Sequence, residues 1–235
     1  MLLKRLRIVL LPGMDGTGAL FQDFVAALPG EIETKVVRYP PDVCLSDLEM
    51  ATLIRSAMPN SEPFVLLAES FSTPLAIRYA STNPPHLLGL VLCAGFVSAP
   101  VRGWRRWICS SLAPILFWMT LPELAARRLL IGLDAPRSLL LAVRAAVSSA
   151  RPMVLSARLR EVLACDVRMQ LARVSVPILY LHAQSDWLVG VSCLEEILRI
   201  KPDAVVEAVE GPHLILQREP RKTAEIVTRF VRQFE

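Results

Sequence analysis

Residues 64–79, FVLLAESFSTPLAIRY, combine an apolar run, a serine between small residues and a segment with helical spacing. This order predicts a buried strand, a sharp turn and a helix. A turn this sharp needs small residues two positions before and after the serine, because their side chains lie against backbone, and Ala68 and Ser72 meet this need. Two interpretations are open: a nucleophile elbow that presents the Ser70 hydroxyl, or a serine that only caps a helix.

The rest of the chain alternates apolar runs with amphipathic segments. Strands are expected at residues 6–11, 32–39, 64–68, 87–94, 176–182 and 204–209. Helices are expected at residues 19–28, 46–58, from the elbow to about 82, 188–200 and 220–234, with Ser46 and Glu49 as a capping box at the second helix. Strands that are apolar throughout and alternate with helices predict an α/β fold with a mostly parallel sheet covered on both faces.

This alternation is interrupted between residues 100 and 171, where Leu, Ala and Arg recur at helical spacing between prolines. The segment predicts three to five short helices inserted between two strands of the sheet. We therefore expect a core domain formed by residues 1–97 and 173–235, with residues 98–172 inserted as a helical cap.

Composition limits the class of protein. In a chain of 235 residues, 53% hydrophobic and 20% charged residues exclude disorder. Five dispersed cysteines without C-x-x-C spacing predict buried free thiols in a reducing compartment, hence a cytoplasmic protein, and neither a disulfide framework nor a metal site. The apolar run near the N-terminus ends too early for a signal peptide, and residues 107–122 are too short for a transmembrane helix.

The charge of the chain is unevenly distributed. Residues 97–173 contain twelve arginines and four acidic residues, a local balance of +8, while the whole chain carries +4. The overall charge is too small to indicate nucleic-acid binding. The basic segment is an expected surface for an anionic partner, an acyl carrier protein or an anionic membrane, or it is only a solvated helical face.

Serine chemistry needs a base and an acid that orients it. Of the three histidines, His86 lies in a turn before a strand and His182 within a strand, whereas His213 follows the last strand directly. Ligands of parallel sheets bind at the carboxyl ends of the strands, so His213 is the expected base. Asp186 follows the preceding strand at the same edge and is the expected acid, with helix capping as the alternative.

The glycine-rich loop after the first strand, residues 11–18, reads LPGMDGTG. It lacks the Gly-Lys-Ser/Thr ending of a P-loop, and its glycine spacing differs from that of a dinucleotide fingerprint, so nucleotide binding is not expected. Oxyanion stabilisation requires the N–H of the residue after the nucleophile, Phe71, and one N–H from this loop, for which Met14 is the expected donor.

Together these motifs resemble the α/β-hydrolase fold superfamily over essentially the whole chain. The loop LPGMDGTG and the Glu-Ser-Phe elbow are similar to those of small bacterial esterase-like hydrolases related to phytyl-ester acyltransferases. The resemblance extends more distantly to carboxylesterases that act on methyl esters bound to acyl carrier protein. It implies Ser70 as nucleophile, Asp186 as acid, His213 as base, and Met14 and Phe71 as oxyanion donors. Pro12 replaces the histidine common in the first loop, and Ala68 and Ser72 replace the two elbow glycines.

The resulting expectation is a serine hydrolase of carboxylic esters or thioesters with an apolar acyl group, acting without metal or organic cofactor. Trp104, Trp107, Phe117 and Trp118 are expected to line an apolar substrate pocket or to pack the cap on the core. An acyltransferase with the same catalytic residues, and a non-catalytic relative that binds an acyl ligand or a carrier protein, remain alternatives.

Overall fold

A single parallel sheet organises the molecule. The computed structural model describes residues 6–101, 103, 111, 117 and 122–235. Its six strands run in the order β2-β1-β3-β4-β5-β6, and every neighbouring pair is parallel. The strands are β1 (Arg7–Leu11), β2 (Glu33–Val36), β3 (Phe64–Glu69), β4 (Leu87–Cys93), β5 (Ile178–Ala183) and β6 (Val205–Val209). The predicted α/β class with a parallel sheet is confirmed.

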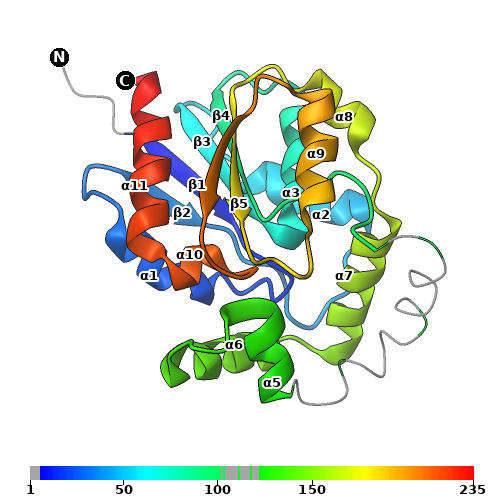
Figure 1. The fold of residues 1–235 in the computed structure, drawn as a ribbon. Helices are drawn as coiled ribbons and strands as arrows, with labels where there is room; N and C mark the ends of the chain where they lie inside the picture. The colour runs from blue at the N-terminus through cyan, green and yellow to red at the C-terminus, as the bar shows by residue number, and fades with distance from the viewer. Residues whose placement is uncertain (1–5, 102, 104–110, 112–116, 118–121) are drawn as a thin grey trace.

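Helices connect the strands (Figure 1). The first part of the chain contains the 3-10 helices η1 (Ala19–Phe21) and η2 (Ser70–Ser72) and the α-helices α1 (Gln22–Ala27), α2 (Asp47–Ala57) and α3 (Thr73–Ala80). After β5 come α9 (Val191–Ile200), α10 (Ile215–Arg218), α11 (Pro220–Val231) and the 3-10 helix η4 (Arg232–Phe234). The predicted capping box at Ser46 and Glu49 is present at α2. The short helix α10 has too few residues to show a period and was not expected.

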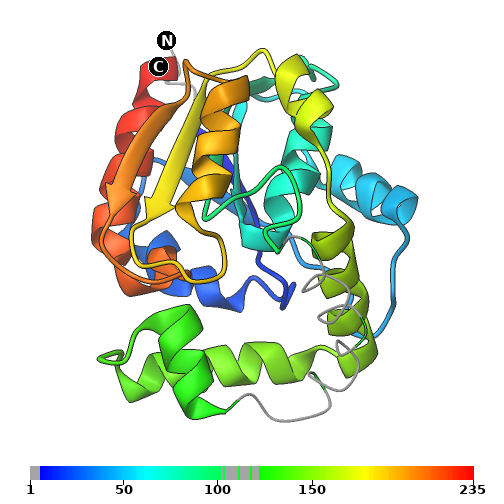
Figure 2. The ribbon, with the colours of Figure 1, turned by 45° about the vertical axis from the view of Figure 1, so that its right-hand side comes forward.

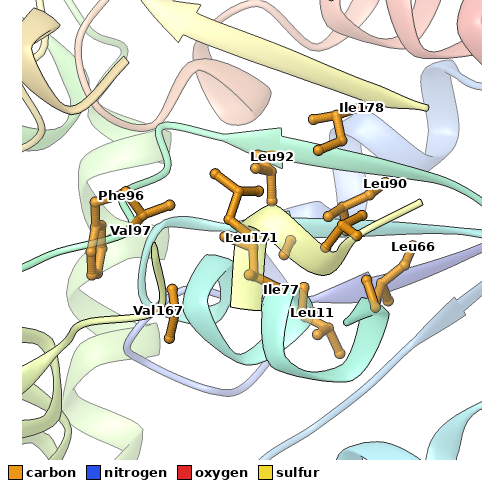
Figure 3. Packing of buried hydrophobic residues seen from close by; sticks show 14 of the residues in the cluster. Leu11, Leu66, Ile77, Leu90, Leu92, Phe96, Val97, Val167, Leu171 and Ile178 are labelled. Atoms are coloured by element: carbon orange, nitrogen blue, oxygen red, sulfur yellow. The ribbon is translucent and has the colours of Figure 1, made fainter. Parts of the chain in front are cut away.

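Both faces of the sheet are buried. Side chains that alternate along β3 and β4 enter two separate apolar clusters: Leu66 and Leu90 face one side, and Val65 and Val91 face the other. Figure 3 shows the first cluster, in which Ile77 of α3 packs over the strands. Residues of α2, α3 and α9 complete this cluster, and residues of α1, α10 and α11 complete the second one. Burial on both faces explains why the inner strands β1, β3, β4 and β5 are apolar at nearly every position, whereas the edge strands β2 and β6 are less buried and carry charged residues.

The segment between β4 and β5 contains helices and no strand among its described residues. These helices are α5 (Glu123–Ala126), the π-helix η3 (Arg127–Ile131), α6 (Arg137–Ser149), α7 (Pro152–Ala164) and α8 (Arg168–Arg173). Helices α5 and α6 lie beyond the carboxyl ends of the strands, as Figures 1 and 2 show from two directions. An isolated antiparallel bridge pairs Ser98 with Asp166 and brings the two ends of this segment together.

The last helix of the segment packs differently from the others. Helix α8 contacts α3 and α9, and its Leu171 belongs to the apolar cluster on that face of the sheet. Helices α5 and α6 and the π-helix η3 meet the core at the loops of its carboxyl edge, where Leu214 joins a small cluster with Ile131 and Leu140, whereas Val162 of α7 packs against the first apolar cluster. The division into a core and a cap of residues 98–172 stays a prediction. Most of helix α8 falls within the predicted cap, but this helix packs with the core helices.

Two sequence expectations concern burial and membranes. Cys93, Cys165 and Cys193 are buried, whereas Cys44 is exposed, so the expectation of buried thiols is wrong for Cys44. Cys109 lies outside the described residues.

None of the described helices is by itself long and apolar enough to cross a membrane. Only α6 and α7 taken together reach that length and composition, and they meet at an angle of 96°.

Candidate active site

Ser70 occupies a strained turn at the carboxyl end of β3. Its φ angle is 49°, in the left-handed region that a residue with a side chain seldom adopts. The chain turns there from β3 into η2 and α3 within one residue. The hydroxyl is therefore presented beyond the end of the strand, as a nucleophile elbow requires.

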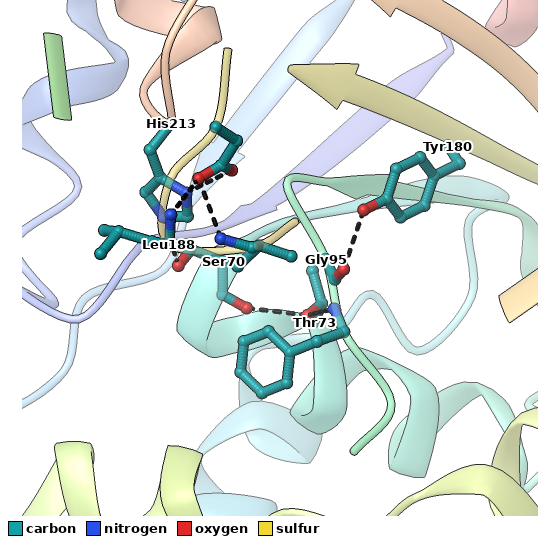
Figure 4. Close-up of polar contacts among 9 residues, drawn as sticks. Ser70, Thr73, Gly95, Tyr180, Leu188 and His213 are labelled. Carbon is teal, nitrogen blue, oxygen red and sulfur yellow. Dashed lines mark hydrogen bonds and ion pairs between the residues drawn. The ribbon is translucent and has the colours of Figure 1, made fainter. Parts of the chain in front are cut away.

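Side chains of neighbouring elements hold this turn in place (Figure 4). The Thr73 hydroxyl donates a hydrogen bond to Ser70 O over 2.8 Å and accepts one from the Phe96 N–H over 3.2 Å. The hydroxyl of Tyr180 on β5 donates to Gly95 O over 2.8 Å. A side chain at Gly95 would come within 2.9 Å of Thr73, so the loop after β4 approaches the elbow as closely as glycine permits. The elbow is thus braced by β4 and β5 as well as by its own strand.

Ser70, His213 and Asp186 form a continuous hydrogen-bonded chain. The distance from Ser70 Oγ to His213 Nε2 is 2.7 Å, and that from His213 Nδ1 to Asp186 Oδ2 is also 2.7 Å. An ionised carboxylate only accepts, so Nδ1 carries the proton and Nε2 accepts from the serine hydroxyl. The side chains of His213 and Asp186 are 5% and 2% exposed, which keeps water from competing for their bond. Figure 4 shows His213 above Ser70.

The environment of His213 makes it a stronger base. Burial alone lowers the pKa of the imidazole. The hydrogen bond to Asp186 and its negative charge, with a smaller contribution from the charge of Glu69, raise the pKa by more, so the net shift is upward. A histidine with this pKa takes up a proton readily and holds it while charge develops on its substrate.

The loop that carries Asp186 is folded around its carboxylate. Asp186 Oδ1 accepts hydrogen bonds from the N–H groups of Leu188 and Val189 over 2.8 and 2.9 Å, which leaves Oδ2 to His213. Helix α9 begins at Val191 with Gly190 at the N-cap position. Helix capping, the alternative role for Asp186, is therefore wrong.

The expected oxyanion donors lie on two adjacent strand ends. Met14 follows β1, and Phe71 follows Ser70 directly; β1 and β3 are neighbours in the sheet. No described residue accepts a hydrogen bond from the Met14 N–H. Ser72, at the position of the second elbow glycine, is fully buried, and its hydroxyl bonds to both Pro12 O and the Tyr39 hydroxyl. Ser72 thereby joins the elbow to the loop after β1, which glycine could not do.

A carboxyl group that the sequence analysis did not single out lies beside these residues. Glu69 is 1% exposed, accepts a hydrogen bond from Gln217 Nε2 over 3.4 Å, and has its other oxygen without a partner in the described part of the chain. Burial raises its pKa to about 7; the Gln217 bond and His213 lower it, and Asp15 raises it. The only sequence signal was a charged residue at the end of an otherwise apolar strand.

The other sequence candidates lie elsewhere. His182 is on β5 and His86 directly precedes β4, and the histidine that bonds to Ser70 is His213. Trp104, Trp107 and Trp118 lie outside the described residues, and Phe117 is half-buried. The apolar pocket expected of these four residues stays a prediction. A cavity between α2, α3 and α7 is lined mainly by apolar residues, which include Met50, Phe71, Pro74, Leu75, Phe96, Val154 and Val162, and also by the charged residues Asp47, Arg78, Arg158 and Glu161.

Among the described residues, no three His, Cys, Asp or Glu side chains come together as metal ligands.

Comparison with known proteins identifies the architecture. No protein-family model matches the sequence, and no curated protein matches it. Solved structures do match over nearly the whole chain: MenH from S. aureus has a TM-score of 0.77 at 14% identity, covering 99% of this chain and 95% of its own. The bromoperoxidase from Bacillus anthracis has a TM-score of 0.80 at 15% identity, covering 96% and 91%. The chain has the α/β-hydrolase fold.

Another α/β-hydrolase with the same extent of similarity is the esterase EaEST from Exiguobacterium antarcticum, with a TM-score of 0.77 at 16% identity, covering 96% of this chain and 91% of its own. The α/β-hydrolase fold that the sequence resemblance implies is therefore confirmed, whereas the narrower subgroup defined by the LPGMDGTG loop stays a prediction. The bromoperoxidase and the esterase are named for different reactions, so the fold alone does not select a reaction.

Proposed function

We propose that this α/β-hydrolase is a serine hydrolase that cleaves carboxylic esters or thioesters with an apolar acyl group. The observation that carries the proposal is the hydrogen-bonded chain from Ser70 through His213 to Asp186, with both links at 2.7 Å, at an elbow where Ser70 has a φ of 49°. Acyl transfer to serine requires a hydroxyl, a base that accepts its proton and a buried acid that orients the base, all joined by hydrogen bonds.

The mechanism follows from these positions. Ser70 Oγ attacks the acyl carbon while His213 Nε2 takes its proton, and Asp186 stabilises the imidazolium that forms. The N–H groups of Met14 and Phe71 hold the negative oxygen of the tetrahedral intermediate. His213 gives its proton to the leaving alcohol or thiol as the acyl-oxygen or acyl-sulfur bond breaks. Water then attacks the acyl-enzyme, His213 takes the proton of the water, and Ser70 leaves with a proton returned by His213.

The apolar acyl part is supported by the cavity between α2, α3 and α7. Phe71, the neighbour of the nucleophile, forms part of its wall. Most of the other lining residues are apolar, and Asp47, Arg78, Arg158 and Glu161 are charged. Pockets of this composition bind alkyl and aryl groups. The acyl-chain preference is measured by kcat/KM over a series of p-nitrophenyl esters and matching thioesters.

The proposal is tested by a fluorophosphonate probe, which labels a serine only when the base next to it is active. We expect one adduct, at Ser70, in the wild-type protein and none in Ser70→Ala. This variant should also lose turnover of short p-nitrophenyl esters while its Tm stays within a few degrees, because the hydroxyl is at the surface end of the elbow. Ser81→Ala, which changes a helix-terminal serine away from the site, is the control. A folded wild-type protein without an adduct would refute the proposal and favour a non-catalytic acyl-binding protein.

Acyl transfer uses the same residues and differs only in the second step, where an alcohol or amine replaces water. Product analysis with added acceptor alcohols separates the two reactions. The exposed arginines of α6 and α7, Arg137 and Arg160, are the proposed contacts for an acyl carrier protein or an anionic membrane.

A further inference from the structure

The loop after β1, residues 12–16, carries the Met14 N–H, and every one of its carbonyl groups accepts a hydrogen bond. Three of these bonds come from the elbow, from the loop itself and from the chain after β2. Ser72 Oγ donates to the carbonyl of residue 12, and Gly16 N–H donates to that of residue 13 over 3.1 Å. Tyr39 N–H donates to the carbonyl of residue 16 over 2.8 Å.

The two remaining carbonyls depend on one side chain, Arg158. Its Nη1 donates to Met14 O over 2.9 Å and to Asp15 O over 3.0 Å. Its Nη2 donates to Pro40 O over 2.9 Å, and the guanidinium carbon lies 5.5 Å from the centre of the Tyr39 ring. Arg158 belongs to α7, more than 140 residues further along the chain, so a helix of the inserted segment reaches into the loop that follows the first strand.

The loop after β1 has room for the Arg158 guanidinium because residue 16 is a glycine. Gly16 has a φ of +75°, and a Cβ atom there would lie 2.6 Å from Arg158 Nη1. Arg158 is 4% exposed, and no described carboxylate lies within ion-pair distance of it. Burial lowers the pKa of the guanidinium. A buried cation that bonds only to carbonyl groups stabilises a fold poorly compared with an apolar side chain of the same volume. Its planar array of donors, however, fixes several carbonyls at once.

We propose that Arg158 is a positioning residue for the oxyanion hole. The guanidinium holds the Met14 and Asp15 carbonyls and so fixes the two peptide planes that follow Met14. The plane that carries the Met14 N–H is joined to them at the Met14 Cα atom and is itself held by the hydrogen bond from Gly16 N–H to Gly13 O, so the whole loop directs this N–H at the oxyanion. Because Arg158 comes from α7, the oxyanion hole is complete only when this helix is docked on the core. This inference rests on the proposed serine hydrolase function.

The test compares full-length wild-type protein with Arg158→Met, Arg158→Lys and the control Arg151→Met, which changes an exposed arginine at the N-cap position of the same helix. With p-nitrophenyl acetate, whose short acyl group needs little of the cavity that Arg158 also lines, Arg158→Met should lower kcat about 100-fold, the effect of losing one oxyanion donor, while KM changes less than about threefold. The affinity for an alkyl trifluoromethyl ketone, whose adduct places an oxyanion in the hole, should fall by a similar factor. Arg158→Lys should lie between, because an ammonium keeps the charge but cannot span three carbonyls. Arg151→Met should match the wild type.

Several results would overturn the inference. One is a folded Arg158→Met protein with unchanged kcat, and another is a rise in KM alone; a loss of activity without loss of ketone affinity would do the same. If Arg158→Met does not fold, Arg158→Lys provides the same three readouts. Failure of the proposed function is distinct, because the wild-type protein itself would then neither hydrolyse the ester nor react with the fluorophosphonate.

Discussion

Two ionisable side chains, His213 and Glu69, lie close enough to each other at the carboxyl edge of the sheet for their charges to interact. Each influences the other: the negative charge of Glu69 raises the pKa of His213, and His213 lowers that of Glu69. Both shifts have a measurable consequence, one for activity and one for stability. They can be separated because only His213 exchanges protons with the substrate in the proposed mechanism.

The first residue-scale prediction concerns pH and activity. His213 must be neutral to act as a base, and its pKa is raised above the ordinary value of 6.5, so kcat/KM should fall on the acid side with an apparent pKa above 6.5. Asp186→Asn removes the charge that raises this pKa but keeps an oxygen for the Leu188 and Val189 N–H groups. We expect kcat to fall by about 10³ to 10⁴ and the acid limb to move to lower pH.

Esterase pH profiles of the two proteins check this prediction, with His86→Gln as a histidine control away from the site. An acid limb that stays in place in Asp186→Asn would mean that another group controls it.

The second residue-scale prediction concerns pH and stability. Burial raises the pKa of Glu69 to about 7 in the folded protein, against an ordinary value of 4.5. Between these pH values the folded protein holds a proton that the unfolded chain has released, so stability falls as the pH rises through this window. Above it, the buried carboxylate costs on the order of 3 kcal/mol, at about 1.4 kcal/mol for each tenfold change in proton affinity.

Glu69→Gln replaces the carboxyl with a neutral group of the same shape. Urea denaturation should give this variant and the wild type similar stabilities near pH 4.5, and the variant should be the more stable at pH 8.5. The exposed Glu195→Gln is the matched control on α9. A stability difference that does not depend on pH would contradict the raised pKa.

At the scale of elements, the elbow and the loop after β1 are joined by Ser72. The sequence indicated only that this position must be small, and the structure adds that its hydroxyl bonds to Pro12 O and to Tyr39. Ser72→Ala keeps the size but leaves two buried polar groups without a partner. We expect a loss of about 1–3 kcal/mol in the free energy of unfolding, measured by urea denaturation.

A double-mutant cycle with Tyr39→Phe isolates the bond between the two hydroxyls. Tyr39→Phe removes one of the groups that Ser72→Ala leaves unpaired. The double variant should therefore lose less free energy of unfolding than the two single variants lose in sum. Strict additivity would show that this bond does not stabilise the protein.

The inserted helices contact the catalytic loops from two sides. Arg158 of α7 holds the loop after β1, and Leu130 O of the π-helix accepts a hydrogen bond from the N–H of Leu214, the residue after His213, over 2.9 Å. Leu130 lies in the last turn of this helix, where carbonyl groups have no partner within the helix and can accept a bond from outside. Both the base and the oxyanion loop are thereby linked to the segment between β4 and β5.

At the scale of the whole molecule, the arginine excess of residues 97–173 divides into several groups. Arg127 pairs with Glu123, Arg168 pairs with Asp166, and Arg158 is buried against carbonyl groups. Arg137 and Arg160 are exposed on α6 and α7. Because some of these arginines are paired or buried, the positive charge exposed to a partner is smaller than the net charge of the segment.

The exposed arginines allow a direct test of an anionic partner. In the double variant Arg137→Gln and Arg160→Gln, kcat/KM for an ester linked to acyl carrier protein should fall by about three- to tenfold at low salt, because charge complementarity speeds association. The free p-nitrophenyl ester should be hydrolysed as by the wild type. Equal effects on both substrates, or none on the carrier-linked one, would dismiss the carrier protein as a partner.

Much of the fold is encoded locally and could be predicted from the sequence. Continuous apolar runs such as residues 64–68 and 87–94 became buried strands because both faces of the sheet are covered, and the capping box at Ser46 fixed the start of α2. Strand β2 is shorter than the predicted residues 32–39, since pairing with β1 ends at Val36. Ends of elements depend on partners that a local pattern does not contain.

The sequence by itself determined the order of strands and helices and the three side chains that follow β3, β5 and β6, because parallel strands bring their carboxyl ends to one edge. Only the tertiary structure decided which groups surround them. Ser72, Tyr39 and Arg158 meet the loop after β1 from three distant parts of the chain, and Glu69 acquires its pKa from burial. Contacts between residues so far apart in the chain have no period or spacing by which a sequence could reveal them.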